Sequence, residues 1–464
     1  MTPPQVRIGS GSGFWGDALD PAIELLQTAD LDYLCMDFLA ELTMALLQRQ
    51  QARDPNLGYV TDLVPYLREL LPVARRARTT IVCNGGGVNP SAGAEAVYAM
   101  AKSIGLTDLR IAVVEGDNLL DRMDDLLARG VAFTNTDTGE QDLDAIRDRI
   151  VAVNAYTGAE GITQAVASGV DVVIAGRVSD SALYIGPLMH EFGWRYTPED
   201  QDRIAAAITV GHVMECAAGV TGGMSSRWVE MPRMGQAGFP YAIVDEDGTA
   251  LLSKVSGSGG HLDQWTVKEH LTYETLDPAR YLAPDGVADF TSLRISEVGP
   301  DQVQLSGMTG SGPPDQLKVI IGYEDGWIGE GMLFFPWPDA LGRAEKAKQT
   351  LLERFDRLGL RSRNIHFDLV GVNMLHGPAA PPPTGDLNEV GLRVAVRTDT
   401  RSEAEKVRRA CSQLWIMGPG GTSFGTPMKP RPVVAAWPTL IPRHLVTQKV
   451  SYPHGAAHLQ EVSS

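Results

Sequence analysis

The feature that most constrains this chain is a series of short apolar runs, each ending in polar residues or glycine. The runs occupy residues 6–8, 31–36, 79–83, 109–114, 150–155 and 170–175. Most are followed by a helical pattern, and β-branched runs without polar alternation predict buried parallel strands. Strands alternating with helices predict an α/β fold. We therefore expect an N-terminal, mostly parallel, doubly wound sheet; a closed barrel would need two further strand–helix units.

Polar residues follow these expected strands at residues 9–13, 37, 84–89, 115–117, 156–158 and 177–180. In an open parallel sheet the carboxyl ends of the strands lie on one edge, which is where such folds bind ligands. The convergence of so many polar strand ends predicts a binding site better than any single motif. The residues expected to carry the site lie mainly between 169 and 223.

Two helices are expected after the run at 170–175, over residues 179–191 with Ser179 as N-cap and over residues 198–218. The second helix carries His212 and Glu215, three residues apart on its surface. A carboxylate on an apolar stripe is costly unless paired, so this pair is a candidate acid–base or metal-binding unit. The alternative is that Glu215 caps a loop while His212 is half-exposed. Cys216 is expected to be a small core residue.

A second pair of carboxylates follows the run at 31–36. Asp37 comes at the end of the expected strand, and Glu41 lies four residues further on, in an expected helix. Such residues share one helix face and could titrate together or hold a metal. The alternative is that Asp37 caps the helix and Glu41 is solvated.

Two glycine-rich loops could touch a ligand through their backbone. The first, GSGSGFWGD at residues 9–17, includes Gly11 and Gly13 and joins a strand to a helix, a layout that suits phosphate. Its spacing fits neither a dinucleotide fingerprint nor a Walker loop, so there is no NAD or flavin signature, and a tight turn is the alternative. The second, NGGGVNP at residues 84–90, sets Gly86 between Asn84 and Asn89; Asn89 is also expected to cap a helix.

The pattern becomes β-rich from residue 225. A hairpin is expected over 241–255, with Lys254 beside the glycine-rich loop that contains Gly259. Lysine there could hold a phosphate, a carboxylate or a thioester carbonyl, or it could be solvated. Residues 340–358 are expected to be a connecting or exposed helix, and the tail after Thr447 is expected to be mobile. We predict segments 1–224 (α/β), 225–340 (β-rich) and 360–447 (small α+β domain).

The charge balance limits the partners. The chain has 57 acidic and 40 basic residues, a net charge of −17, which argues against nucleic acid and anionic membranes. Four widely spaced cysteines indicate neither disulfides nor a structural zinc site and fit a cytoplasmic protein. No run is apolar and long enough to span a bilayer, and the N-terminus lacks a signal-type apolar segment. We expect a homo-oligomer.

The sequence resembles the acyclic terpene utilisation (AtuA-like) family. The matching stretches lie at 8–17, 32–34, 39–41, 84–90, 170–183, 193–194, 211–216, 221–223, 254–260, 273–278, 281–285 and 288–290. The resemblance implies a C-terminal ferredoxin-like domain, and it implies catabolism in which intermediates are branched acyl-CoA thioesters. It supplies no established catalytic residues.

We therefore predict an enzyme acting on a carboxylate or acyl-CoA, most plausibly a lyase or hydratase. Glu215 or Asp37 would be the base and His212 its proton partner. CoA would be part of the substrate; the cofactor and metal content are unknown. Alternatives are a non-catalytic, partner-dependent subunit and a metal-dependent hydrolase built on His212, Glu215 and Asp37. The residues expected to contact substrate are Gly11, Gly13, Asn84, Gly86, Asn89, Arg177, Asp180, Thr221, Gly222, Lys254 and Gly259.

Overall fold

The computed structural model describes residues 4–425 and 428–454. The chain divides into two compact units. The first unit comprises Met1–Gly322 and Ala436–Ser464, and the second unit comprises Tyr323–Ala435. Two strands, β14 (Gln316–Pro336) and β18 (Arg431–Pro442), run from one unit to the other and pair with each other. The second unit is therefore an insertion into the first.

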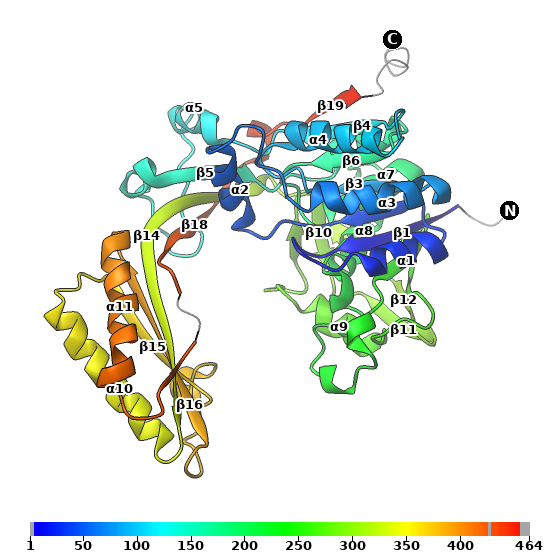
Figure 1. Ribbon diagram of the computed structural model, residues 1–464. Helices are drawn as coiled ribbons and strands as arrows, with labels where there is room; N and C mark the ends of the chain where they lie inside the picture. Colours follow the sequence, from blue (N-terminus) through cyan, green and yellow to red (C-terminus); the bar gives the residue numbers. More distant parts are fainter. Residues whose placement is uncertain (1–3, 426–427, 455–464) are drawn as a thin grey trace. The chain divides into compact units, whose positions relative to one another are not determined.

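A ten-stranded mixed sheet is the centre of the first unit (Figure 1). Its strand order is β11-β12-β8-β7-β1-β2-β3-β6-β4-β19. The strands from β1 to β4 in this order are parallel, whereas the flanking strands are antiparallel to their neighbours. The bounds are β1 Gln5–Ser12, β2 Tyr33–Met36, β3 Thr80–Cys83, β4 Ile111–Glu115, β6 Val172–Ala175, β7 Pro240–Asp245, β8 Ala250–Lys254, β11 Arg294–Gly299, β12 Gln302–Ser306 and β19 Lys449–His454.

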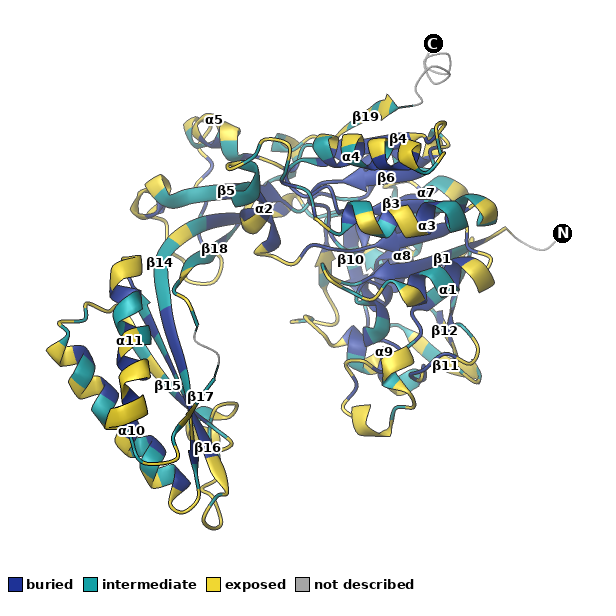
Figure 2. Ribbon diagram, in the orientation of Figure 1, coloured by how far each residue is buried: buried dark blue, intermediate teal, exposed yellow. Residues whose placement is uncertain are grey.

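Helices cover both faces of this sheet. On one face α1 (Asp20–Thr28), α3 (Leu63–Ala77) and α4 (Pro90–Ser103) pack on Ile81 and Cys83. On the other, α6 (Glu160–Ala167), α7 (Ala182–Phe192) and α8 (Gln201–Met214) pack on Val82. Adjacent residues of one strand face opposite layers, which explains why these strands lack polar alternation (Figure 2). The predicted mixed α/β character is confirmed.

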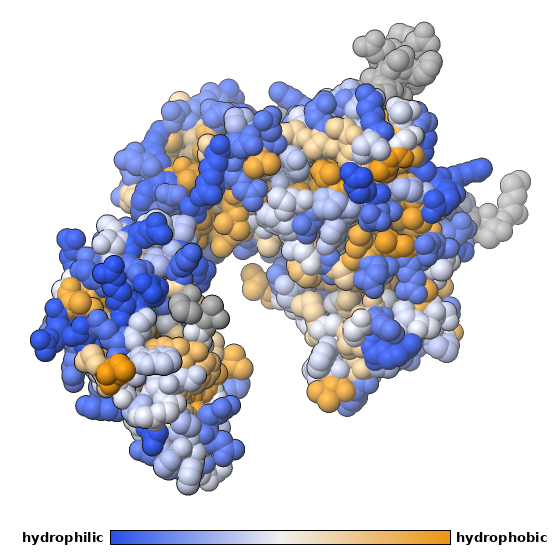
Figure 3. All heavy atoms as spheres, in the orientation of Figure 1, coloured by the Kyte–Doolittle hydropathy of each residue, from blue (hydrophilic) through white to orange (hydrophobic). Residues whose placement is uncertain are grey.

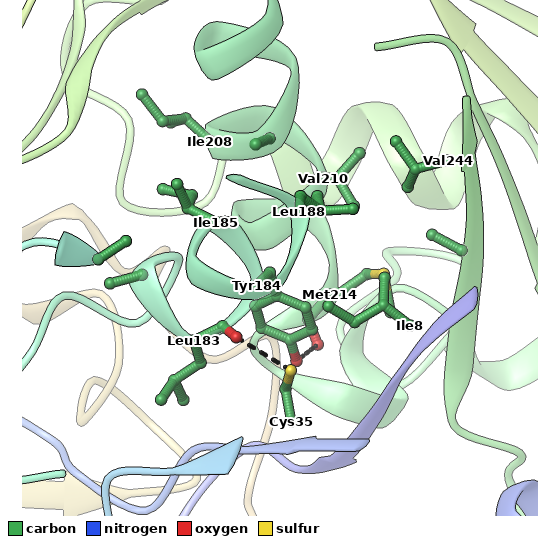
Figure 4. Packing of buried hydrophobic residues seen from close by; sticks show 14 of the residues in the cluster. Ile8, Cys35, Leu183, Tyr184, Ile185, Leu188, Ile208, Val210, Met214 and Val244 are labelled. Carbon is green, nitrogen blue, oxygen red and sulfur yellow. Dashed lines mark hydrogen bonds between the residues drawn. The ribbon is translucent and has the colours of Figure 1, made fainter. Parts of the chain in front are cut away.

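Two hydrogen bonds from buried side chains fix the α7–α8 layer near the strand ends (Figure 4). Cys35 Sγ on β2 donates to Leu183 O at 3.1 Å, and Tyr184 Oη donates to Met214 O at 3.2 Å. Tyr184 is fully buried, so its hydroxyl needs such a partner. The second bond holds the backbone immediately before Glu215.

Three sequence predictions are wrong in detail. The run at 150–155 forms β5 (Ile150–Ala155), but it pairs with β14 and is not part of the parallel sheet. The helix expected over 198–218 ends at Met214. The expected mobile tail contains β19, which pairs antiparallel with β4; the part of the tail beyond residue 454 lies outside the described residues. The predicted hairpin of β7 and β8 is confirmed, and it extends the same large sheet.

Smaller elements complete the first unit. A three-stranded sheet contains β9 (Tyr281–Ala283), β10 (Gly286–Asp289) and β13 (Thr309–Ser311), and it packs on α8. The remaining helices are α2 (Thr43–Gln51), α5 (Met123–Ala128) and α9 (Gln264–Leu271). Within 4–425 and 428–454 no helix is long and apolar enough to cross a membrane. All four cysteines are free thiols.

The second unit is a sheet with two helices on one face. Its strands β15 (Asn364–Val370), β16 (Glu389–Thr398), β14 and β17 (Ser423–Phe424) are adjacent in that order. The helices α10 (Ala340–Arg357) and α11 (Arg401–Met417) share its core. The expectation that 340–358 is only a connector is wrong, because Ala344, Leu351 and Phe355 are buried there. A ferredoxin-like assignment of this region stays a prediction.

We predict that Gln448→Ala destabilises the first unit. The Gln448 side chain accepts a hydrogen bond from Gly161 N at 2.8 Å and donates to Thr157 Oγ1 and Gly158 O, each at 2.9 Å. Its loss removes these three hydrogen bonds, although Thr157 Oγ1 keeps its bond to Arg177 O, and should lower the free energy of unfolding by about 1–3 kcal/mol. Urea denaturation measures this, with the exposed Gln141→Ala as control; equal midpoints for the two variants would contradict the prediction.

Candidate functional site

The ends of β2 and β3 are joined by a short polar network. Asn84 Nδ2 donates to Asp37 Oδ1 at 2.5 Å, and Asn84 Oδ1 accepts from Phe38 N at 2.8 Å. Asp37 Oδ1 also accepts from Leu39 N at 3.1 Å. Asp37 is only 5% exposed. Two strand ends far apart in sequence therefore deliver one buried carboxyl group that is held through a single oxygen.

Arg177, at the end of β6, connects this network to its own loop. Its guanidinium is buried, and it donates from Nη1 to Leu39 O at 2.6 Å, from Nε to Val178 O at 2.7 Å and from Nη2 to Asp180. The ring of Tyr156 lies 4.4 Å from the guanidinium carbon. A buried cation of this kind needs such partners. Asp180, with 31% of its side chain exposed, is the more accessible member of the ion pair.

His212 and Glu215 meet at the C-terminal end of α8. His212 Nδ1 lies 3.3 Å from Glu215 Oε1. The imidazole is fully buried among aromatic rings, with Tyr281 at 4.6 Å and Phe290 at 5.6 Å between centroids. His212 Nδ1 faces Glu215 Oε1, and the backbone of His270 and Leu271 lies near the ring, but neither ring nitrogen meets the geometry of a good hydrogen bond. A buried imidazole needs such partners.

Burial favours the uncharged forms of three groups in this cluster. Burial first, then the nearby Asp180 carboxylate, raises the pKa of Asp37 well above its usual range, and Arg177 partly opposes this. Burial, then Asp180 and Glu274, raises the pKa of Glu215 in the same way. Burial lowers the pKa of His212 to about 4. These directions disfavour an ion pair between Glu215 and His212, whereas Arg177 and Asp180 form one.

A further carboxyl group follows β4. Asp117 Oδ2 accepts from Asn154 Nδ2 at 2.8 Å, and burial raises the pKa of Asp117 to about 6. An added Cβ at Gly176, one residue before Arg177, would lie 2.4 Å from Asp117 Oδ1. The ends of β2, β3, β4 and β6 thus gather at one edge, as the sequence predicted.

The glycines and Asn89 have structural explanations in their surroundings. A Cβ on Gly11 would lie 2.8 Å from Met36 Cγ, and one on Gly13 would lie 2.7 Å from the backbone of Cys216. Gly86 N donates to Ala175 O at 3.1 Å. The predicted cap is confirmed, because Asn89 accepts from Ala92 N at the start of α4. Its amide also donates to Pro55 O and Leu57 O.

The remaining predicted residues form a separate cluster at β8. Lys254 is buried, with Nζ 3.1 Å from Ser258 O and 3.2 Å from Asp301 Oδ2. Thr221 Oγ1 donates to Gly238 O at 2.7 Å. Gly222 has φ +110°, which only glycine adopts freely, and Gly259 N donates to Gln236 O at 2.6 Å. The structure therefore groups Asp37, Asn84, Arg177, Asp180, His212 and Glu215, and places Thr221, Gly222, Lys254 and Gly259 in this second cluster.

Asp37 and Glu41 do not share a helix face, and the alternative of an exposed Glu41 agrees with the structure. Residues 37–40 are not helical, and α2 begins only at Thr43. Glu41 is exposed and pairs with Lys318. Within the described part of the chain, no three His, Cys, Asp or Glu side chains are arranged to hold a metal.

Sequence reasoning from the residues missed two groups near this cluster. The ring of Tyr281, at the start of β9, lies tilted against His212. Glu274 has a left-handed backbone, with φ +54°, and its charge acts on Glu215. Both follow His212 and Glu215 by about sixty residues or more in sequence, and only the resemblance to the family included them. Tyr156, one of the polar strand ends singled out in the sequence, contacts Arg177.

The larger surface grooves lie elsewhere. One of about 690 Å³ in the second unit is lined by Arg401, Arg409 and Lys429 among others. One of about 830 Å³ in the first unit is lined by Arg122, Arg129 and His444 among others. A cavity of only about 10 Å³ borders Arg177 and Tyr156. The candidate site is thus a buried polar cluster and not a wide open pocket.

These features define a mixed α/β protein with a buried acid–base cluster at the carboxyl edge of its parallel strands. The model of the family described as acyclic terpene utilisation family protein AtuA matches residues 6–452, so the chain belongs to that family. No curated protein and no solved structure matches the chain. The resemblance found in the sequence is therefore confirmed at the level of the family.

We predict that Glu215→Gln gains stability relative to the wild type as pH rises. The native carboxyl keeps its proton at pH values where the unfolded one, with a pKa near 4.5, has lost it. The native state then binds more protons, so the free energy of unfolding falls with rising pH, by about 1.4 kcal/mol per pH unit until the native pKa is reached. Glutamine does not ionise and escapes this loss.

Urea denaturation at pH ~5 and pH ~8 measures the effect. The matched control is Glu69→Gln, which removes an exposed carboxyl group from α3. A Glu215→Gln difference that is the same at both pH values would contradict a protonated native Glu215.

Proposed function

We propose that this member of the acyclic terpene utilisation family is a cytoplasmic enzyme of branched-chain or terpenoid-type metabolism. Its substrate class is a carboxylate or an acyl-CoA thioester, with CoA as part of the substrate, and its reaction is a lyase or hydratase step. The observation that carries the proposal is the buried Glu215–His212 contact beside Arg177 and Asp180. Strongly shifted pKa values in one cluster favour acid–base chemistry over a purely structural role.

Adding water across a carbon–carbon double bond conjugated to a carbonyl group requires two proton transfers. In this direction the base takes a proton from the water whose oxygen bonds to the β carbon, and the acid gives a proton to the α carbon; elimination of water reverses both transfers. Protonated Glu215 suits the acid, with His212 Nδ1 at 3.3 Å as the group with which it exchanges a proton. Asp37 suits the base in its carboxylate form, which Arg177 and the hydrogen bonds from Asn84 and Leu39 favour against the effect of burial.

Developing negative charge on the substrate would be stabilised by nearby donors. Each terminal nitrogen of Arg177 uses one contact to hold Leu39 O or Asp180 and carries a second N–H. The N–H groups already in use let Arg177 position Asp180. The second N–H of each terminal nitrogen would stabilise an oxyanion. Lys254, whose ammonium is engaged by Asp301 in the second cluster, would contact only a more distant part of an extended substrate.

The test combines binding and turnover. Branched acyl-CoA thioesters, free branched acids, CoA alone and divalent ions are compared by the shift that they cause in the thermal midpoint, because ligands of the native state raise it. We predict a shift with the thioester or acid. For the turned-over substrate, Glu215→Gln and Asp37→Asn should each lower kcat by about 10²–10⁴-fold.

Glu69→Gln on the exposed side of α3 is again the control and should keep full activity. Tight binding without turnover would overturn the enzymatic proposal and favour a partner-dependent subunit. A shift with metal ions alone would favour a hydrolase. Unchanged kcat in both variants would remove Glu215 and Asp37 from the chemistry.

A further inference from the structure

The net charge is divided very unequally between the two units. Residues 323–435 hold 15 lysines and arginines and 13 aspartates and glutamates, so the second unit carries +2. The rest of the chain carries −19, and the two parts together give the net charge of −17. Two copies of this protein therefore repel each other through their first units. The second unit is the part of the chain that a second copy can approach at low electrostatic cost.

The second unit also exposes large apolar side chains at one end. The apolar stripe of α11 that faces the core includes Ala404, Val407 and Leu414. The last three residues of the helix depart from this stripe, although all are apolar. Trp415 is 68% exposed, Ile416 83% and Met417 54%. In an amphipathic helix that only covers its own sheet, the outer side is normally polar.

These residues continue into neighbouring apolar surface. Trp415 stacks on Phe424 of β17, with centroids 5.4 Å apart. The segment after α11 returns to the end of β14, where Gly421 lies against the ring of Pro336. Trp337, which follows Pro336 in the chain, is 62% exposed. Hydrophobic residues are visible on the surface of this unit in Figure 3. We call the set Trp337, Trp415, Ile416, Met417 and Phe424 the apolar end.

Patches of this composition are typical of protein–protein contacts. Tryptophan and methionine are enriched at the cores of interfaces, where a few large side chains supply most of the binding energy. A stable interface of standard size buries roughly 800 Å² on each partner. The apolar end would supply its core, and polar residues on the outer side of α11, such as Arg409 and Ser412, would supply its rim.

We propose that the apolar end is a self-association surface that meets the same surface of a second copy about a twofold axis. A symmetric contact places apolar side chains against apolar side chains, which a polar partner would not do. It also joins the two nearly neutral units through their own surfaces. This contact gives the expected homo-oligomer a specific interface, and it is independent of the proposed enzymatic activity.

The test is sedimentation velocity on the full chain over a range of concentrations. The wild type should sediment with twice the 50.0 kDa mass of one chain. Ile416→Asp places a charge at the centre of the surface and should raise the dissociation constant by about tenfold or more. The site is exposed in the single chain, so the variant should keep its fold; circular dichroism and the thermal midpoint check this.

The matched control is Leu276→Asp, which adds the same charge at a fully exposed leucine of the first unit. It should leave the mass unchanged. Raising the ionic strength should maintain or tighten the wild-type dimer, because salt screens the repulsion between acidic first units. A wild type that is monomeric at every concentration, an Ile416→Asp protein that still dimerises as the wild type does, or dissociation by Leu276→Asp would each overturn the proposal.

Discussion

The edge of the sheet depends on one buried cation. Arg177 follows strand β6, and its guanidinium bridges the backbone after β2, its own loop and Asp180. A guanidinium that is 1% exposed can be ionised only where several acceptors surround it. The loops that bring Asp37 and Asp180 near each other therefore owe their positions to the need to satisfy Arg177. The same charge partly opposes the rise in the pKa of Asp37 and Glu215.

The acid–base pair at α8 follows a different physical rule. His212 and Glu215 are neighbours because they are three residues apart at the end of one helix, so their proximity was visible in the sequence. Their ionisation was not, because it depends on aromatic rings from β9 and its neighbourhood that enclose the imidazole. The spacing in the sequence shows that the two side chains meet, whereas the apolar surroundings of the folded protein set their pKa values.

The limits of prediction lie in the pairing of strands. Runs such as 79–83 and 170–175 were recognisable because both faces of each strand are covered by helices. The run at 150–155 has the same composition but pairs with β14, more than 150 residues later, and no local pattern encodes that partner. The same holds for β19 and for Tyr281, which approach their positions only through long-range packing. Glu41 was misplaced because the helix starts only at Thr43, two residues after Glu41.

The way in which the second unit is attached has a consequence for its integrity. The chain enters it through β14 and leaves it through β18, and these two strands pair with each other. At the start of β14, Arg443 N donates to Asp315 O at 2.9 Å, so the two crossings begin side by side. A single proteolytic cut within the inserted unit would produce two fragments of that unit. Each fragment would stay attached to the first unit, one through β14 and the other through β18, and these strands pair with each other. In this respect the unit behaves as a closed loop of the fold and not as a pendant domain on one linker.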